Sequence, residues 1–222
     1  MNAPDNILDK KRNIRLEVIS RRNSIPAEER TCKSAIVCQR ISEVLDKVLP
    51  IHRQPFVAVY AAMNSEVDLG NFIEYAYKRD ARIAFPCMTK PEGDDSSRNT
   101  SNGLYADKAR RPLMLMRLVP PEAYLHGSVP FIRNPIKPLR ENDHSLRPFP
   151  IVRPEDIDMA IIPMVAFDGS CMRLGYGGGN YDSFLSKARD DAFIVGAAFE
   201  EQRVPLVPAE KHDLPLPLIE TA

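Results

Sequence analysis

The sequence contains no tryptophan and only four cysteines, and no two of these cysteines form a Cys-x-x-Cys pair. No histidine stands at metal-ligand spacing from them, so the sequence predicts neither a zinc site nor a disulfide framework. Unpaired thiols of this kind are typical of a reducing compartment, and we therefore expect a cytoplasmic protein.

An excess of charge of either sign is also missing, because Lys and Arg total 30 and Asp and Glu also total 30. This balance gives no basis for binding a polyanion or a charged membrane surface, so we expect neither nucleic acid nor membrane as a partner. The first residues are charged rather than apolar. No uncharged hydrophobic run approaches the roughly 18 residues that a membrane-spanning helix needs.

The length of the chain predicts one domain. A chain of 222 residues can bury one core without disulfide or metal support, so we expect a single domain over residues 1–222. We also expect a monomer. The segment 89–112 is polar and charged, which predicts a flexible, solvated insertion. Most of the 20 prolines lie in residues 112–154 and 205–217, and these two stretches predict irregular structure.

Hydrophobic periodicity predicts helices that alternate with strands. The predicted helices cover residues 7–22, 26–48, 68–79 and 181–188, the second of them with Pro26 at its first helical position. The predicted strands cover residues 56–60, 82–86, 113–118, 158–163 and 193–199. This alternation predicts an α/β fold with a mostly parallel sheet that helices cover on both faces, including a βαβ unit over residues 56–86.

Glycine is scarce, and four of the ten glycines fall within residues 175–179. Such a cluster lets the backbone adopt positive φ and bring its N–H groups close to an anion. Arg173 stands before it, where a guanidinium can bind phosphate oxygens, and Asp182 follows, where a carboxylate can hold Mg²⁺. The segment is neither a Walker A motif nor a dinucleotide fingerprint. Two alternatives remain, a tight strand-to-helix connection and a helix in which Asp182 complements the dipole.

The segment 173–182 reads Arg-Leu-Gly-Tyr-Gly-Gly-Gly-Asn-Tyr-Asp and follows Ile-Ile-Pro-Met-Val-Ala-Phe-Asp. This pattern resembles the signature of the 5-formyltetrahydrofolate cyclo-ligase (methenyltetrahydrofolate synthetase) family. The segments 11–30, 60–68 and 198–213 are similar to other parts of that family's pattern. The resemblance implies a three-layer α/β/α, Rossmann-like fold with a mixed, mostly parallel sheet, similar to the NagB/RpiA/CoA-transferase-like fold.

The resemblance also implies a reaction. In that family, ATP with Mg²⁺ activates the formyl oxygen of 5-formyltetrahydrofolate, and N10 of the same molecule then closes the ring. Loss of phosphate yields 5,10-methenyltetrahydrofolate, so the products also include ADP and phosphate. By this resemblance the protein is an ATP- and Mg²⁺-dependent ligase whose partner is a small folate.

The resemblance implies a nucleotide site around the glycine cluster. Lys11 and Arg15 would contact the ATP phosphates, and their i, i+4 spacing places both on one helical face. Arg173 would be catalytic and hold the transferred phosphate, and Asp182 would hold Mg²⁺. The other implied nucleotide-binding residues are Leu174, Gly175, Tyr176, Gly177, Gly178, Gly179 and Tyr181. Without the resemblance, Lys11 and Arg15 also fit a solvated basic face, and Tyr181 also fits the core.

On the folate side, the resemblance implies that Glu66 is a second catalytic residue near the pterin or formyl group, and that Tyr60 and Phe131 contact the substrate. The chain departs from the family pattern at Asn180, where an aromatic residue is usual, and in residues 131–135. These departures leave an alternative, a nucleotide- or folate-binding relative with altered catalysis. A dinucleotide-dependent oxidoreductase is a further alternative, but the fingerprint register that it needs is missing.

Overall fold

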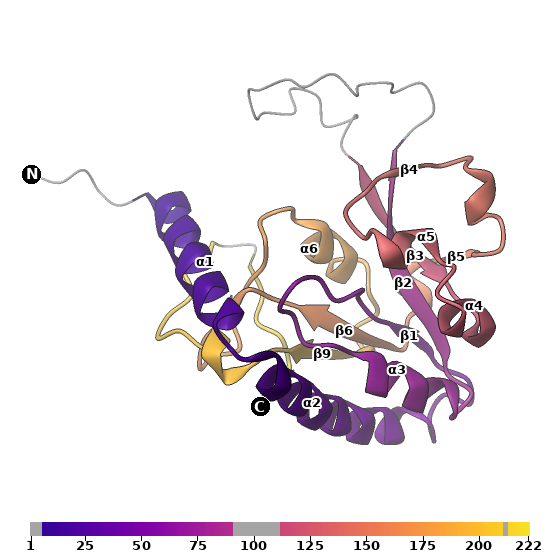
Figure 1. Ribbon diagram of the computed structural model, residues 1–222, viewed down its shortest axis with the longest axis horizontal. Coiled ribbons are helices and arrows are strands. Elements are labelled where there is room, and N and C mark those ends of the chain that lie inside the picture. The colour runs from indigo at the N-terminus through magenta and orange to yellow at the C-terminus, as the bar shows by residue number, and fades with distance from the viewer. Residues whose placement is uncertain (1–5, 91–111, 211–212) are drawn as a thin grey trace, which may run out of the picture.

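A computed structural model of the protein describes residues 6–90, 112–210 and 213–222 (Figure 1). Its α-helices are α1 (Ile7–Asn23), α2 (Ala27–Val48), α3 (Gly70–Tyr77), α4 (Pro121–Leu125), α5 (Pro130–Arg133) and α6 (Asn180–Leu185). Its strands are β1 (Phe56–Ala58), β2 (Arg82–Lys90), β3 (Leu113–Leu118), β4 (Leu139–Arg140), β5 (Ile151–Val152), β6 (Met159–Pro163), β7 (Ala166–Phe167), β8 (Arg173–Leu174), β9 (Phe193–Ala197) and β10 (Ile219–Glu220). Short 3₁₀ helices cover His144–Leu146, Pro154–Asp156 and Glu200–Gln202.

The predicted sheet is confirmed. Eight strands form it in the order β10-β9-β6-β1-β2-β3-β5, and β4 also pairs with β2. The pairs β10–β9, β9–β6, β6–β1, β1–β2 and β2–β4 are parallel, whereas β2–β3 and β3–β5 are antiparallel. The unit β1-α3-β2 is the predicted βαβ unit, since β1 and β2 are parallel and adjacent.

Alternate residues of the central strands point into two cores on opposite faces of the sheet. Val57 and Ile161 pack with residues of α2 and α3 in one core. Their neighbours Ala58 and Ile162 pack with Phe184 of α6 in the other. Figure 1 shows this layering, with α2 and α3 below the sheet and α6 above it.

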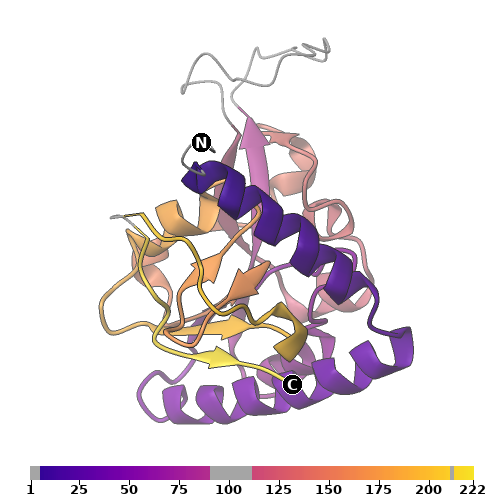
Figure 2. The same cartoon turned by 90° about the vertical axis from the view of Figure 1, so that its left-hand side faces the viewer.

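The helix α1 lies outside these layers. Its buried Val18 packs against the short hairpin β7–β8 and against residues that follow the 3₁₀ helix Glu200–Gln202. Figure 2 shows α1 crossing this side of the molecule in front of the sheet. The helix matches its prediction closely, and α2 begins one residue later than predicted, so that Pro26 is its N-cap.

Three parts of the chain differ from the prediction. The strand β2 runs to Lys90 rather than ending at Pro86. Its pairing with β1 ends at Ala84, so Pro86 has no β1 residue opposite it. A proline is tolerated at such a position because its missing N–H is not needed for a hydrogen bond between strands. The stretch 112–154 is not wholly irregular, since Pro121 and Pro130 each begin a short helix. Of the predicted insertion 89–112, Thr89 and Lys90 belong to β2, and residues 91–111 lie outside the described residues.

A hairpin that the sequence did not predict separates the buried strand β6 from the glycine cluster. Its strands β7 and β8 pair antiparallel, Ala166 with Leu174 and Phe167 with Arg173. The turn is organised by Asp168, whose buried carboxylate accepts hydrogen bonds from the backbone N–H groups of Ser170 and Met172. The hairpin therefore fixes where the glycine cluster begins.

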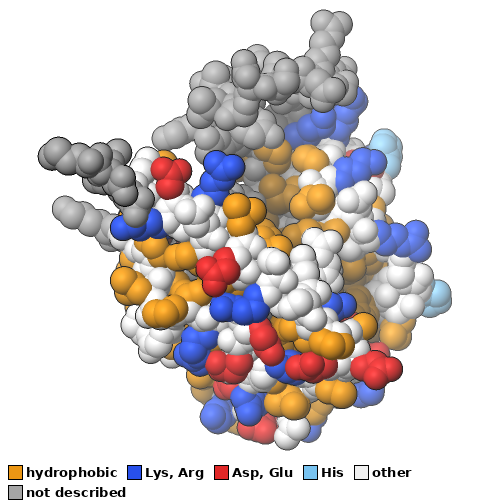
Figure 3. All heavy atoms as spheres, turned by 60° about the vertical axis from the view of Figure 1, so that its left-hand side comes forward, with side chains coloured by type: hydrophobic (Ala, Val, Ile, Leu, Met, Phe, Trp, Pro, Cys, Tyr) orange, Lys and Arg blue, Asp and Glu red, His pale blue; other side chains and the backbone are white. Residues whose placement is uncertain are grey.

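Among the described residues, no helix is long and apolar enough to cross a membrane. Acidic and basic side chains are mixed on the face of the molecule beside α1 (Figure 3). This mixture agrees with the zero net charge of the chain.

Candidate functional site

A cavity with a volume of about 620 Å³ lies at the carboxyl ends of the parallel strands. Tyr60 and Ala61 follow β1, and Pro163 ends β6, and all three line it. In the sheet, β2 lies on one side of β1, and β6, which comes later in the chain, lies on the other side. The strand order therefore reverses at β1. Ligands of open α/β sheets bind at such a switch point. The cavity is therefore the first candidate for a functional site.

Residues 175–179, called the glycine loop from here on, form one wall of the cavity. Gly177 has φ +98° and Gly179 has φ +69°, a backbone region that side chains other than glycine's rarely adopt. Gly179 is also the N-cap of α6. Within the described part of the chain, no acceptor is hydrogen-bonded to the backbone N–H groups of Gly177, Gly178 and Gly179. The loop can therefore offer these N–H groups to an anion.

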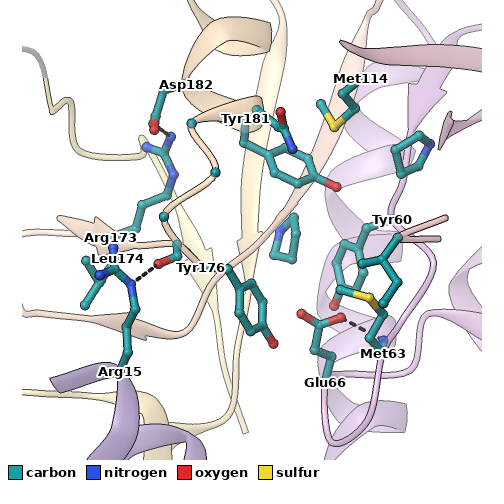
Figure 4. A pocket seen from close by; sticks show the side chains of 18 of the residues that line it. Arg15, Tyr60, Met63, Glu66, Met114, Arg173, Leu174, Tyr176, Tyr181 and Asp182 are labelled. Carbon is teal, nitrogen blue, oxygen red and sulfur yellow. Dashed lines mark hydrogen bonds and ion pairs between the residues drawn. The ribbon is translucent and has the colours of Figure 1, made fainter. Parts of the chain in front are cut away.

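The helix α1 places two basic side chains beside the glycine loop. Arg15 donates a 2.8 Å hydrogen bond from Nε to the carbonyl oxygen of Gly175, and its guanidinium packs against Gly177 (Figure 4). Burial lowers the pKa of Arg15 from its ordinary value. Lys11, one turn earlier, is only 8% exposed. The alternative of a solvated basic face therefore does not describe Lys11 and Arg15.

Carboxylates form ion pairs with Lys11 and Arg173 at the same end of the cavity. Lys11 Nζ lies 2.9 Å from Glu210 and 2.8 Å from Asp213. Burial opposes the charge of Lys11, but the hydrogen bonds with Asp213 and Glu210 together raise its pKa. Arg173 pairs with Asp182, which lies in the first turn of α6, and Figure 4 shows these two side chains pointing toward each other. Three cations and three carboxylates thus surround this end of the cavity.

Glu66 stands at the other end, in the loop that follows β1. It is 8% exposed, and its Oε2 accepts a 2.8 Å hydrogen bond from the backbone N–H of Met63. Among the described residues, no hydrogen-bond partner reaches the buried Oε1. Burial raises the pKa of Glu66, against the opposing effects of the Met63 N–H, the Tyr176 hydroxyl and the Arg22 charge. A buried carboxylate with an unpaired oxygen is suited to bind a hydrogen-bond donor of a ligand.

The remaining wall is mostly apolar. It is formed by Pro86, Met88, Met114, Pro135 and Ile136, none of which was predicted to be a site residue, although Pro135 ends the segment 131–135 that departs from the family pattern. Asn180 faces this wall, and the described residues give its amide one weak contact, 3.9 Å from Nδ2 to the sulfur of Met88. Flexible thioethers adapt to flat aromatic ligands, so this wall fits a planar heterocycle.

The structure brings thirteen of the fourteen predicted site residues to one cavity. These are Lys11, Arg15, Tyr60, Glu66, Arg173, Leu174, Gly175, Tyr176, Gly177, Gly178, Gly179, Tyr181 and Asp182. Phe131 is placed elsewhere: it is 1% exposed and packs edge-on against Phe149, with ring centroids 5.3 Å apart. It does not line the cavity, whereas Pro135 and Ile136 a few residues later do.

Sequence reasoning also missed Glu210 and Asp213 as cavity residues. They lie in the proline-rich C-terminal stretch, where no periodicity shows which side chains point inward. The signal that could have found them is the match of the segment 198–213 to the family pattern, since acids in such a segment are candidates for a site.

The chain is similar in sequence to proteins named 5-formyltetrahydrofolate cyclo-ligase. The chain is 25% identical to a 5-formyltetrahydrofolate cyclo-ligase of Escherichia coli K12 over 173 residues, which cover 78% of this chain and 80% of that protein. It is 44% identical to the Haemophilus influenzae enzyme of the same name over 62 residues, which cover 28% of this chain but only 33% of that protein.

Two solved structures share the fold. A 5,10-methenyltetrahydrofolate synthetase from Mycoplasma pneumoniae has a TM-score of 0.63 at 18% identity, covering 95% of this chain and 98% of that one. The synthetase from Aquifex aeolicus has a TM-score of 0.61 at 21% identity, covering 95% and 89%. The sequence model of the 5-formyltetrahydrofolate cyclo-ligase family matches residues 7–222. The chain therefore belongs to the 5-formyltetrahydrofolate cyclo-ligase family.

Proposed function

We propose that the protein catalyses the ATP- and Mg²⁺-dependent cyclisation of 5-formyltetrahydrofolate to 5,10-methenyltetrahydrofolate, with release of ADP and phosphate. The observation that supports this most is that one cavity of about 620 Å³ has two ends with different chemistry. One end has cations and a glycine loop, and the other has an apolar wall and a buried carboxylate. The volume lies within the range of typical small-molecule sites.

The first end suits the phosphates of ATP. Lys11, Arg15 and Arg173 supply positive charge, and the glycine loop supplies backbone N–H groups. Both kinds of donor bind phosphate oxygens, and the guanidinium does so with two parallel hydrogen bonds. Lys11 and Arg173 are paired with carboxylates, so phosphate binding would exchange one set of anionic partners for another.

The same end suits Mg²⁺. Mg²⁺ is commonly bound by one or two carboxylates together with substrate phosphates and water. Asp182 would supply such a carboxylate once phosphates compete for Arg173, and Glu210 and Asp213 are two further acids that line the cavity. The described residues contain no cluster of three or more His, Cys, Asp or Glu that would hold a metal alone, which fits a metal that arrives with the nucleotide.

The second end suits the folate. Met88 and Met114 would contact a flat ring, and Glu66 would accept a hydrogen bond from an N–H group of the substrate at its unpaired Oε1. Tyr60 supports this side from behind, because its buried hydroxyl donates a 2.9 Å hydrogen bond to the carbonyl of Val67, next to Glu66.

The chemistry requires a weakly nucleophilic formyl oxygen to be held in line with the terminal phosphate while charge develops on the phosphate oxygens. ATP supplies the phosphoryl group that turns this oxygen into a leaving group. The protein would hold the folate against Glu66 and the apolar wall, and Arg173 with the loop N–H groups would neutralise the developing charge.

An absorbance assay tests the proposal. The purified protein is mixed with 5-formyltetrahydrofolate, ATP and Mg²⁺, and the near-ultraviolet absorbance of the methenyl product is followed. We expect a gain that requires all three components, and we expect Arg173→Ala to abolish it while the thermal unfolding profile keeps one cooperative transition. Absence of any gain at high protein concentration would refute the activity.

The same material separates the enzyme from a binding protein with altered catalysis, the alternative that Asn180 suggests. Calorimetry with ATP and 5-formyltetrahydrofolate measures binding without turnover. Tight binding of both ligands without methenyl formation would favour the binding protein, whereas ADP release that depends on the formyl folate would favour the enzyme.

A further inference from the structure

Arg22, near the C-terminal end of α1, is 2% exposed and among the most deeply buried large side chains of the protein. Its Nε donates a 2.9 Å hydrogen bond to the hydroxyl of Ser65, and its Nη2 donates a 2.7 Å hydrogen bond to the hydroxyl of Tyr176. Among the described residues, no acceptor reaches its buried Nη1. A buried charge is costly unless its hydrogen bonds are strong, so these two bonds need an explanation.

The two partners belong to the two loops that define the cavity. Ser65 directly precedes Glu66, and it donates in turn to the side chain of Asn23 beside Arg22. Tyr176 lies between Gly175 and Gly177 in the glycine loop. Arg22 does not line the cavity itself. One rigid guanidinium fork thus joins the loop that bears Glu66 to the loop that would bind phosphate.

The position of the Tyr176 side chain depends strongly on its hydrogen bond with Arg22. Glycines flank it on both sides, and Gly177 has a positive φ, so the backbone restrains it weakly. The residue is 45% exposed, and the Arg22 guanidinium lies 5.9 Å from its ring centroid. Figure 4 shows its ring between the basic residues and Glu66, with the hydroxyl toward the Glu66 side.

The bond also determines which way the Tyr176 hydroxyl can donate. A phenol has one proton and two acceptor sites, and Arg22 occupies one of these acceptor sites. The proton of the hydroxyl is then directed to another acceptor, either Glu66 or an oxygen of a ligand in the cavity.

We infer that Arg22 is a positioning residue, which acts through Tyr176 to hold the glycine loop and the Glu66 loop at one spacing for the bound folate and nucleotide. This inference rests on the proposed function. It assigns no contact between Arg22 and either ligand. Its consequence is that loss of Arg22 and loss of the Tyr176 hydroxyl remove the same interaction.

A double-mutant cycle tests this consequence. The proteins are the wild type, Arg22→Met, Tyr176→Phe and the double variant, and kcat/KM for 5-formyltetrahydrofolate is measured for each. We expect each single variant to lose roughly tenfold, as for one hydrogen bond to a charged group. We expect the double variant to lose no more than the worse single variant, because residues that share one interaction are not additive.

Arg21→Met is the matched control, because Arg21 is the neighbouring arginine and its guanidinium bonds to the backbone carbonyls of Glu201 and Arg203 instead. It should keep kcat/KM within about twofold of the wild type. Arg22→Lys should recover part of the loss, since one ammonium can reach Tyr176 or Ser65 but cannot copy the fork. If Arg22→Met does not fold, the cycle of Arg22→Lys with Tyr176→Phe replaces it.

The outcomes are distinct. A wild-type protein without cyclisation activity would refute the proposed function and this inference with it. An active wild type in which the two losses multiply, or in which Arg22→Met and Arg22→Lys leave kcat/KM unchanged, would refute the inference alone. A loss of kcat/KM that is equal in Arg21→Met and Arg22→Met, and that is proportional to the fall in thermal midpoint, would also refute the inference.

Discussion

At the scale of single residues, the candidate site contains buried charged groups whose hydrogen bonding is incomplete, and such groups cost stability. Glu66 is the clearest case, because it is buried, its pKa is raised by that burial, and no described residue is hydrogen-bonded to its Oε1. Arg22 leaves a donor unpaired nearby. Functional sites commonly keep such groups at a cost to folding.

Replacing the Glu66 carboxylate should therefore stabilise the folded protein and impair its activity. We expect Glu66→Gln to raise the free energy of unfolding by about 1 kcal/mol at pH 8 and to raise KM for 5-formyltetrahydrofolate. The pKa of Glu66 is higher in the folded than in the unfolded state, so its ionisation costs folding energy above the folded pKa. As the pH falls through that pKa toward 4.5, the folded protein takes up the proton first and the cost disappears.

Urea unfolding of both proteins between pH 8 and pH 5 measures this difference. The advantage of Glu66→Gln should be largest at pH 8 and should shrink toward pH 5. An advantage that is equal at both ends, or a variant that is less stable at pH 8, would contradict the expected role of burial.

A second residue-scale prediction concerns the glycine loop. An alanine at Gly177 would have to adopt φ +98°, and its Cβ would lie 3.4 Å from Arg15 Nη2. Strain of this kind costs roughly 1 to 3 kcal/mol, and relaxing it would move the loop N–H groups. We expect Gly177→Ala to lower the thermal midpoint and to weaken ATP binding measured by calorimetry. Gly169→Ala is the control, because its added Cβ meets no atom within 4 Å, and it should change neither.

At the scale of elements, the parts that were predictable are those whose side chains repeat with a clear period. The amphipathic pattern of residues 26–48 predicted α2, and the apolar runs around Val57 and Ile161 predicted strands of the sheet. The hairpin β7–β8 and the strands β4, β5 and β10 have two residues per strand, too few to show a period of two. Their positions depend on tertiary hydrogen bonds that no local pattern records.

The hairpin that precedes the glycine loop depends on Asp168. Burial opposes ionisation of this carboxyl, but hydrogen bonds from Ser170, Val207 and Met172 prevail and lower its pKa. We expect Asp168→Asn to reduce the free energy of unfolding at pH 7 by roughly 1 to 3 kcal/mol, because an amide oxygen cannot accept all of these bonds. The depressed pKa means that the stabilisation is present above pH 3.8 and is lost as the pH falls through the folded pKa.

Acid unfolding followed by circular dichroism compares Asp168→Asn with the wild type. The stability gap should shrink as the pH falls below 3.8 and should close once the pH is below the depressed folded pKa, where both side chains are neutral. A gap that stays constant from pH 7 to pH 3 would show that the charge of Asp168 is irrelevant to the hairpin.

At the scale of the whole molecule, the cavity exists because distant parts of the chain meet at one edge of the sheet. Lys11 of α1, Glu66 after β1, the glycine loop and Asp213 near the C-terminal end all line it. The sequence could predict the residue types at several of these positions from the family pattern. It could not predict that Phe131 packs on Phe149 while Ile136 faces the cavity, because this depends on how the chain turns after α5.

A ligand that touches all of these segments should stabilise the whole fold. Binding to the folded state alone adds about 2.7 kcal/mol at a ligand concentration one hundred times Kd. For a chain of this size, each kcal/mol raises the thermal midpoint by roughly 2 to 4 °C. We therefore expect saturating ATP with Mg²⁺ to raise the midpoint of the wild type by roughly 5 to 10 °C in differential scanning calorimetry.

Each variant is compared with its own ligand-free midpoint, so that a change in basal stability does not obscure the shift. Arg173→Ala should lose most of the shift, because Arg173 would bind the phosphates that bring the segments together. Arg79→Ala should keep it, because Arg79 packs on the ring of Tyr75 and pairs with Asp46, away from the cavity. An unshifted wild type would contradict a phosphate site at the glycine loop, since the fold would then gain nothing from a ligand at the junction of its segments. An equal shift in Arg173→Ala would also contradict it, since the ligand would then be bound without the guanidinium that this site requires.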